Sequence, residues 1–561
     1  MTRWKAVLLY GLAFACWWPL ASKASGEDPP AAPEEEPPAA AVAASGELPS
    51  DEALERAGAV IGEIRVDGVD IFDTRIEEEN NALYRLANRL HIETRDRTIL
   101  QQLLVKPGDP YKARLLRESE RLLRATGYIR EAEIRVVGYS EGRVDLQVTT
   151  QDVWTLKPGI TFSHKGGSSS SSIGIEETNL FGLGKTLGLD FSSDVDRTSQ
   201  ALLYRDPHLA GSWWALDAQY ANNSDGQVQK LALERPFHAL DAHWSTGILL
   251  SDDKHIDSVY QLGEIVNTYT TAERLATVYG GWSAGLVDGY VTRWSVGFSF
   301  RDTQHGPVDQ PLPGSTVPPG LRLAYPWLGF AWIEDMYQTS TNLNQIGKTE
   351  DIAMGWNVEG RFGLASTSWG SDRDAAVFLA KFSKGWQPTP TQRLLLNGHA
   401  EGRIERDGGL AGALFDLTAR YYLKQSSWST FYATATVERG VDLDPDQQIL
   451  LGGDNGLRGY PLRYQSGNGR WLLTLEQRAY TDWYPFRLFR VGGAVFYDMG
   501  RTWDSPPGTS QGLLRDLGFG LRVGNTRSAL GTVIHVDLAF PLDGDPSIKK
   551  VQFVIEGKSS F

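Results

Sequence analysis

The sequence is poor in cysteine, in methionine and in long apolar runs. Its 561 residues include one cysteine, Cys16, and four methionines. After the N-terminal segment, no run reaches the about 18 consecutive apolar residues that a membrane-spanning helix requires. We therefore expect no helical membrane anchor, and no cysteine in the chain once the segment that contains Cys16 has been removed.

Basic residues are also in deficit. Lysine and arginine number 55 against 69 aspartates and glutamates, which gives a net charge of -14. Nucleic-acid binding depends on a basic surface that neutralises phosphates, so we predict no nucleic-acid partner. The nine histidines show no metal-ligand spacing. The sequence therefore predicts neither a metal site nor a cofactor.

The first 24 residues have the pattern of a signal peptide. Arg3 and Lys5 precede an apolar run at 7–21, and the small residues at 22–24 offer a cleavage site after Ala24. A lipoprotein signal at Cys16 is the alternative, but Phe14 is bulky where such a site needs a small residue. We therefore predict export from the cytoplasm.

Residues 25–57 form a Pro/Ala/Glu-rich linker. The stretch contains DPPAAPEEEPPAAAVAA and lacks the apolar periodicity that would bury a core. We predict an extended acidic tether. A docking segment for a partner is the alternative.

Residues 58–157 have the pattern of a small α+β domain. Ile61, Ile64 and Val66 open a strand, and Leu83, Leu86 and Leu90 recur at helical spacing. The predicted elements are a first strand, helices at 76–90 and 111–125, and strands at 132–137 and 143–149. A sheet of three strands keeps at least one free edge.

Two strings in this segment resemble a POTRA domain, the periplasmic module of outer-membrane assembly and secretion proteins. They are GDPY at 108–111 and ESERLLRATGYIREAEI at 118–134. The resemblance implies that the free sheet edge pairs with an extended client chain by strand addition. It also implies that this domain lies in the periplasm.

Residues 158–561 alternate as a β structure with apolar residues on the outside. Phe553 and Ile555 point one way while Gln552 and Glu556 point the other, and aromatic residues make up 11% of the chain. Short turns such as 287–289 separate some strands, and longer polar stretches such as 302–321 separate others. Apolar-out alternation fits a closed barrel in lipid, where every backbone group is paired. The fold class is therefore mainly β, a transmembrane antiparallel β-barrel preceded by one small α+β domain.

A glycine-rich stretch at 448–464, QILLGGDNGLRGYPLRY, carries the central motif. The pair GLRGY at 456–460 and FYDMG at 496–500, in this order near the end of the chain, resembles the BamA and TamA family. In that family the arginine of an inward-folded loop contacts acidic residues on the lumen wall. The resemblance implies a sixteen-stranded barrel and a loop lock made by Arg458, Gly459, Tyr460, Glu476, Phe496, Asp498 and Gly500.

The same resemblance assigns roles to both ends of the barrel. It implies that Arg458 pairs with Asp498 and Glu476, and that the terminal Phe561 is a barrel-insertion signal. The chain departs from the family in having room for one POTRA-like domain before residue 158. The implied location is the outer membrane.

Three other motifs in the sequence give weaker evidence of function. Residues 281–285 match G-x-S-x-G, but no helix follows and no acid and histidine come in order. Asp442, Asp444 and Asp446 lack the glycine and distal glutamate of a calcium loop. Residues 168–172 are all serine and predict a flexible loop or turn. We predict no catalytic residue and no enzyme.

The predicted function is outer-membrane protein assembly or translocation. The POTRA-like domain would bind an unfolded or extended client, and the barrel would insert or export it. The alternatives are a plain outer-membrane channel or structural barrel, and a lipid exporter. The predicted partners are outer-membrane lipid, the client protein, and the assembly machinery that inserts this barrel.

Overall fold

The computed structural model describes residues 48–505, 512–528 and 533–558. The predicted signal peptide, most of the predicted tether and Phe561 lie outside the described residues. Within the described residues, none of the helices combines the length and the apolar character needed to cross a membrane.

The N-terminal domain contains four helices and a three-stranded sheet. The strand order is β1-β3-β2, with β1 parallel to β3 and β2 antiparallel to it. Leu116, Ser119 and Leu123 of α4 are buried at helical spacing against the sheet, which explains why this segment is a helix. The elements are α1 Asp51–Arg56, β1 Val60–Val69, η1 Glu77–Glu79, α2 Ala82–Leu90, α3 Asp96–Gln102, α4 Ala113–Ala125, β2 Ile129–Ser140 and β3 Arg143–Asp152.

Helix α1 lies in the stretch that the sequence assigned to the tether. Ser50 caps it by accepting a hydrogen bond from the Ala53 N–H, and Leu54 is buried in the domain core. The folded region therefore includes residues before Ala57.

Helix α2 is shorter than the pattern indicates and faces differently. Asn81 caps it by accepting a hydrogen bond from the Tyr84 N–H at 3.0 Å, so the helix begins at Ala82. Tyr84 is its buried side chain and stacks on Phe72. The three leucines at helical spacing instead lie on the surface, with exposed fractions of 64%, 50% and 64% for Leu83, Leu86 and Leu90.

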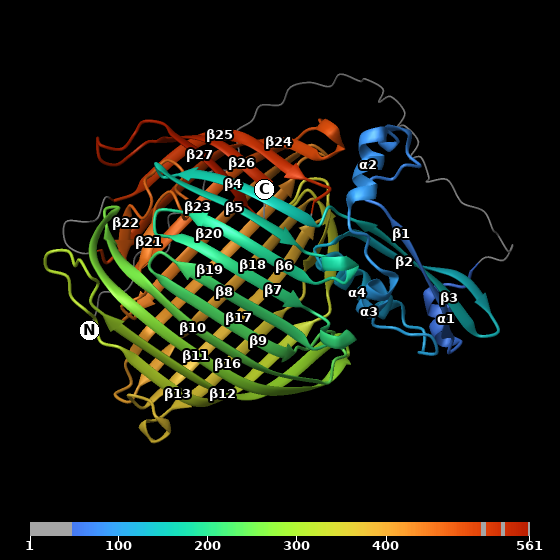
Figure 1. Ribbon diagram of the computed structural model, residues 1–561, viewed down its shortest axis with the longest axis horizontal. Coiled ribbons are helices and arrows are strands. Elements are labelled where there is room, and N and C mark those ends of the chain that lie inside the picture. Colours follow the sequence, from blue (N-terminus) through green and yellow to red (C-terminus); the bar gives the residue numbers. More distant parts are fainter. Residues whose placement is uncertain (1–47, 506–511, 529–532, 559–561) are drawn as a thin grey trace. The chain divides into compact units, whose positions relative to one another are not determined.

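The rest of the described chain forms one closed antiparallel barrel (Figure 1). Consecutive strands pair around the ring, and β27 closes it against β4. The strands are β4 Leu156–Lys165, β5 Ser168–Glu177, β6 Thr186–Ser193, β7 Thr198–Asp206, β8 Ala215–Asn223, β9 Gly226–Arg235, β10 Trp244–Gln261, β11 Glu264–Val287, β12 Tyr290–Gly306, β13 Leu321–Glu334, β16 Asn357–Ala365, β17 Ala375–Thr389, β18 Gln392–Glu405, β19 Leu410–Lys424, β20 Ser429–Val441, β23 Gly469–Tyr480, β24 Phe489–Trp503, β25 Leu514–Asn525, β26 Val533–Pro541 and β27 Gln552–Lys558.

The expectation of sixteen strands was wrong, because the described part of the chain builds a barrel of twenty. The first strands, β4 to β9, are short and polar, so the composition of these segments does not distinguish them from loops. The serine run at 168–172, predicted as a loop or turn, forms the first half of β5. It pairs antiparallel with β4, with Ser168 opposite Lys165. A strand needs only alternation, and here small hydroxyl side chains supply the polar positions while Ile173 and Ile175 face outward at 60% and 49% exposure.

The barrel wall is apolar outside and polar inside, which confirms the predicted alternation. On β25, Leu517, Phe519 and Leu521 are exposed on the outer face, while Asp516 and Arg522 on the inner face are fully buried. Closure pairs the strand edges, so this arrangement suits a lipid exterior.

The two ends of the barrel differ. We call the end of the barrel at which the chain passes from the small domain into β4 the domain side, and the opposite end the far side. The strand connections at 288–289, 390–391 and 425–428 lie on the domain side, and the 14-residue connection at 307–320 lies on the far side. The domain side has one long connection, residues 335–356, which contains the hairpin β14 Tyr337–Thr341 and β15 Thr349–Ala353. The prediction of short turns at one end and long loops at the other is therefore wrong. The far side also has two-residue turns at 166–167, 224–225 and 262–263, and the domain side has eight-residue connections at 178–185, 207–214 and 236–243.

Ion pairs join the domain to the domain-side connections. Arg124 of α4 donates two hydrogen bonds to Asp351, at 2.8 and 2.9 Å. Arg114 pairs with Asp241, and Arg527 pairs with Glu79. Glu118 accepts from the Leu240 N–H at 2.8 Å, and its burial raises its pKa.

Candidate functional site

The predicted loop folds back into the barrel. Residues 442–468 join β20 to β23 on the far side and form a small hairpin, β21 Ile449–Leu451 with β22 Gln465–Gly467. Asn455 shapes its turn by accepting from the Gly452 N–H and donating to the Leu450 carbonyl. Leu451, Leu457, Tyr460, Tyr464 and Leu514 form a buried cluster that joins the loop to the barrel wall.

Arg458 is the centre of the site. Its guanidinium donates to both oxygens of Asp498, at 2.7 and 2.9 Å, and to Glu476 at 2.9 Å. The side chains of Arg458, Glu476 and Asp498 are exposed by at most 5%. This two-pronged contact uses the fork of the arginine, which a lysine cannot reproduce.

The other predicted residues surround this contact. The Phe496 ring lies 3.3 Å from the Arg458 guanidinium carbon. Gly459 donates its N–H to Asp516 at 3.1 Å, and the Tyr460 hydroxyl donates to the Arg515 carbonyl at 2.7 Å. Gly500 lies where a Cβ atom would come within 2.8 Å of the Trp471 carbonyl oxygen. The structure thus brings Arg458, Glu476, Phe496 and Asp498 into contact, while Gly459, Tyr460 and Gly500 contact other residues of the barrel wall and the loop.

Four further charged residues complete the site, and the sequence reading missed them. Asp516 lies opposite Asp498 in the β24–β25 register, and Asp537 lies 3.5 Å from Arg458. Arg522 pairs with Asp537, and Arg478 donates to Glu476 at 3.0 Å. Their alternation marked them as lumen-facing, but only the strand register and the loop path bring them to Arg458.

The arrangement is an electrostatic clamp on the barrel wall. Four consecutive strands, β23 to β26, each contribute one carboxylate: Glu476, Asp498, Asp516 and Asp537. Two carboxylates directly opposite each other destabilise a strand pair. The loop supplies two donors to these carboxylates: Arg458 donates to Asp498, and the Gly459 N–H donates to Asp516. The loop therefore stabilises the strands that it contacts.

The hairpin β14–β15 on the domain side contacts the same part of the barrel wall as the loop lock. Its tip buries Leu343 and Ile346, and Ile346 packs with Tyr480, Ala494 and Val533, all on lumen-facing positions. Arg478 donates to the Leu343 carbonyl at 3.1 Å as well as to Glu476. Arg478 therefore connects the loop lock to the hairpin, and Asp351 connects the hairpin to helix α4 of the domain.

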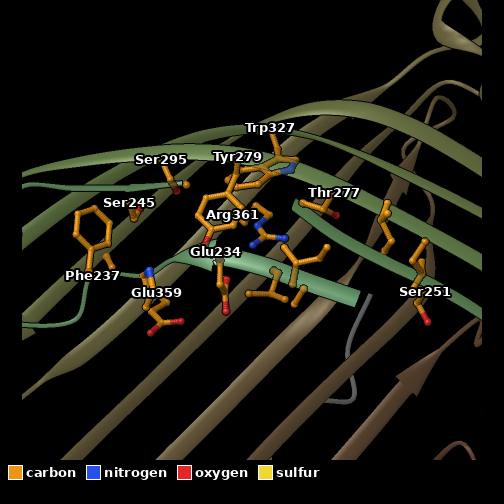
Figure 2. A pocket seen from close by; sticks show the side chains of 18 of the residues that line it. Glu234, Phe237, Ser245, Ser251, Thr277, Tyr279, Ser295, Trp327, Glu359 and Arg361 are labelled. Atoms are coloured by element: carbon orange, nitrogen blue, oxygen red, sulfur yellow. Dashed lines mark hydrogen bonds between the residues drawn. The ribbon is translucent and has the colours of Figure 1, made fainter. Parts of the chain in front are cut away.

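A cavity of about 880 Å³ lies between β9 to β13 and β16 and β17, away from the wall that carries the loop lock. Figure 2 shows Tyr279, Trp327, Arg361 and Glu234 grouped in it. Tyr279 donates to Glu234 at 2.8 Å, and Arg361 lies 4.0 Å from the Trp327 ring centre. The loop and the hairpin therefore leave open space in the lumen, lined by charges of both signs.

The remaining sequence candidates have structural partners. Ser283 of the G-x-S-x-G match lies in β11 and donates to the Thr292 carbonyl at 2.8 Å. Asp444 receives two hydrogen bonds from Arg403, both at 2.8 Å, and Asp446 lies 3.5 Å from Arg301. These two carboxylates serve as arginine partners on the loop.

No protein-family model and no curated protein matches this sequence. Among solved structures, the chain is similar to BamA from Haemophilus ducreyi lacking POTRA domains 1-3, at 15% identity and a TM-score of 0.37, with 88% of this chain and 84% of that chain covered. It is also similar to CdiB from Acinetobacter baumannii, at 14% identity and a TM-score of 0.42, covering 89% and 74%. CdiB from Escherichia coli matches at 13% identity and a TM-score of 0.44, covering 93% and 92%. A likeness of this size does not establish an activity.

Proposed function

We propose that this protein is an outer-membrane assembly or translocation factor of the BamA and TamA type. Its POTRA-like domain binds an extended client protein in the periplasm, and its barrel inserts that client or exports it. The observation that carries the proposal is Arg458, held by Asp498 and Glu476 through a loop folded into the lumen. A plain channel needs neither this loop nor a domain ion-paired to its mouth.

The closing strand pair of the barrel supports movement of a client. In the described residues, β27 and β4 share a single register position, Ile555 opposite His164. By contrast, β4 pairs with β5 along its whole length, from Leu156 to Lys165. Few ladder hydrogen bonds join these two strands within the described residues, and we propose that the barrel opens at this seam.

The free sheet edge of the domain supports client binding. Helix α4 occupies part of the β2 edge, since Glu120 accepts from the Ile134 N–H and Arg124 donates to the Ala132 carbonyl. Beyond these contacts β2 continues to Ser140, and Val137 and Tyr139 are exposed by 45% and 36%. An extended chain would pair with this outer half of β2.

Photo-crosslinking in cells tests the proposal. A photoreactive phenylalanine analogue replaces Tyr139 on the β2 edge, and the matched control replaces the exposed Arg117 on α4. We expect trapped outer-membrane or secreted proteins at position 139 and none at position 117. Trapped lipid without protein at position 139 would favour the lipid exporter, and equal trapping at both positions would contradict client binding by the edge.

A further inference from the structure

Helix α2 presents an apolar face that nothing in the described structure covers. We call Leu83, Leu86 and Leu90 the leucine face. At about 100° per residue these side chains fall within one narrow stripe. Their exposed fractions are 64%, 50% and 64%, whereas Tyr84 on the neighbouring face is 8% exposed. The helix is therefore already anchored in the protein by one face and offers the next one outward.

The anchor fixes the helix at the barrel rim. Tyr84 stacks on Phe72 with ring centres 4.2 Å apart, and Leu488 packs against this pair. Leu488 ends the connection at 481–488 between β23 and β24, which we call the rim connection. Glu79, just before the helix, pairs with Arg527 of the next domain-side connection. These contacts hold α2 where the outer wall of the barrel ends (Figure 1).

The rim connection carries apolar side chains of its own. Trp483 and Phe486 are exposed by 65% and 71%. Large aromatic residues at the end of a barrel wall mark the level of the lipid headgroups. The leucine face and these exposed aromatic residues therefore lie on two elements that contact each other through Leu488 and Tyr84.

The flanking charges fit the same environment. Arg89 is exposed on α2 beside the leucine stripe, whereas Arg85 is exposed at least about 100° round the helix from each leucine. A helix with leucines on one side and an arginine next to them is typical of a segment that lies in the plane of a membrane surface. Arginine side chains reach from such a position to the phosphate level.

We infer that the leucine face docks on the phospholipid layer at the domain-side surface of the outer membrane. The helix lies flat there and keeps the POTRA-like domain beside the rim. This inference rests on the barrel being embedded in a membrane, which is part of the proposed function.

The test places single labels on the full chain in phospholipid nanodiscs. Residues 1–24, including Cys16, are replaced by a cysteine-free export signal, so Leu86→Cys supplies the only thiol for a fluorophore. Some of the phosphatidylethanolamine and phosphatidylglycerol carries a spin label near the headgroup, because an interfacial helix buries its apolar face by about 5–10 Å. Phe486→Cys on the rim connection reports barrel insertion independently, and Arg85→Cys is the control on the other side of the helix.

We expect severalfold stronger quenching by the spin-labelled lipid at position 86 than at position 85, close to that at position 486. Adding Leu83→Gln and Leu90→Gln should remove the quenching at position 86 and leave that at position 486 unchanged. Quenching at 486 with equal, weak quenching at 85 and 86 would overturn the inference while leaving the barrel in its membrane. A change in fluorescence at position 86 that depends on protein concentration and not on the spin-labelled lipid would show that the leucine face binds a second copy of the chain. That result would also overturn the inference.

Discussion

At the scale of single residues, Arg458 makes the central contacts of the loop lock. Replacing Arg458 with alanine leaves Asp498 buried without its cation, while Glu476 keeps the hydrogen bond from Arg478. Breaking a buried ion pair in this way typically costs about 3 to 5 kcal/mol, less where lumen water reaches the site. We expect lower resistance to denaturant and heat, measured as unfolding of the purified barrel in detergent.

Two companion variants separate charge from packing. Adding Asp498→Asn to Arg458→Ala should restore part of the lost stability, because it removes the unpaired carboxylate. Arg515→Lys is the matched control, since Arg515 makes a similar two-pronged contact with Asp543 but its side chain is 43% exposed. An Arg458→Ala variant as stable as Arg515→Lys would contradict the structural role of the loop lock.

Gly459 gives an independent measure of how closely the loop fits the wall. A Cβ atom there would lie 2.7 Å from the Asp516 Cβ and 3.1 Å from the Pro541 nitrogen. We expect Gly459→Ala to destabilise the barrel by about 1 to 3 kcal/mol, as overpacking does. Gly557→Ala, where an added Cβ meets no atom within 4 Å, should change little in the same unfolding assay.

At the scale of elements, the hairpin at 335–356 should obstruct the lumen. Its tip packs Ile346 against Tyr480, Ala494 and Val533 of the inner wall. Replacing residues 342–348 by a short glycine-serine turn should raise single-channel conductance in planar bilayers. Shortening the far-side connection at 307–320 by seven residues is the control. Equal conductance of the two variants would show that the hairpin does not narrow the path.

The elements also show what the sequence could and could not predict. The motif pair around Arg458 and Asp498 located the loop lock, because the motif residues come from a short and specific pattern. The sequence did not predict four other charged residues of the site, because strand register decides which lumen-facing charges come into contact. These residues are Asp516, Asp537, Arg478 and Arg522. The strand number was wrong because sixteen came from the family resemblance, and short polar strands such as β5, which opens with the serine run, are hard to recognise from composition. The leucines of α2 matched a core helix because periodicity identifies an apolar face but not what covers it.

At the scale of the whole molecule, Arg124 and Asp351 tie the domain to the barrel. Their contact joins α4 to the hairpin that Arg478 connects with the loop lock. Asp351→Arg should loosen the domain, seen as a broader distribution of spin-label distances between the domain and the barrel. The double exchange Arg124→Asp with Asp351→Arg should narrow the distribution again. A distribution that stays narrow in the single variant would mean that other contacts suffice.

The central claim is that the barrel handles a client by opening between β27 and β4. Cysteines at Ile555 and His164, which lie opposite each other, allow the seam to be closed by a disulfide in a chain that lacks Cys16. The matched control joins Val523 and Ile534, an outward-facing pair on β25 and β26.

The deciding measurement is the outer-membrane and secreted proteome of cells that carry each cross-linked barrel, with and without reductant. The account predicts that closing the seam depletes the client proteins and that reductant restores them, while the control cross-link has no effect. Unchanged proteomes with a fully cross-linked, inserted seam would contradict it.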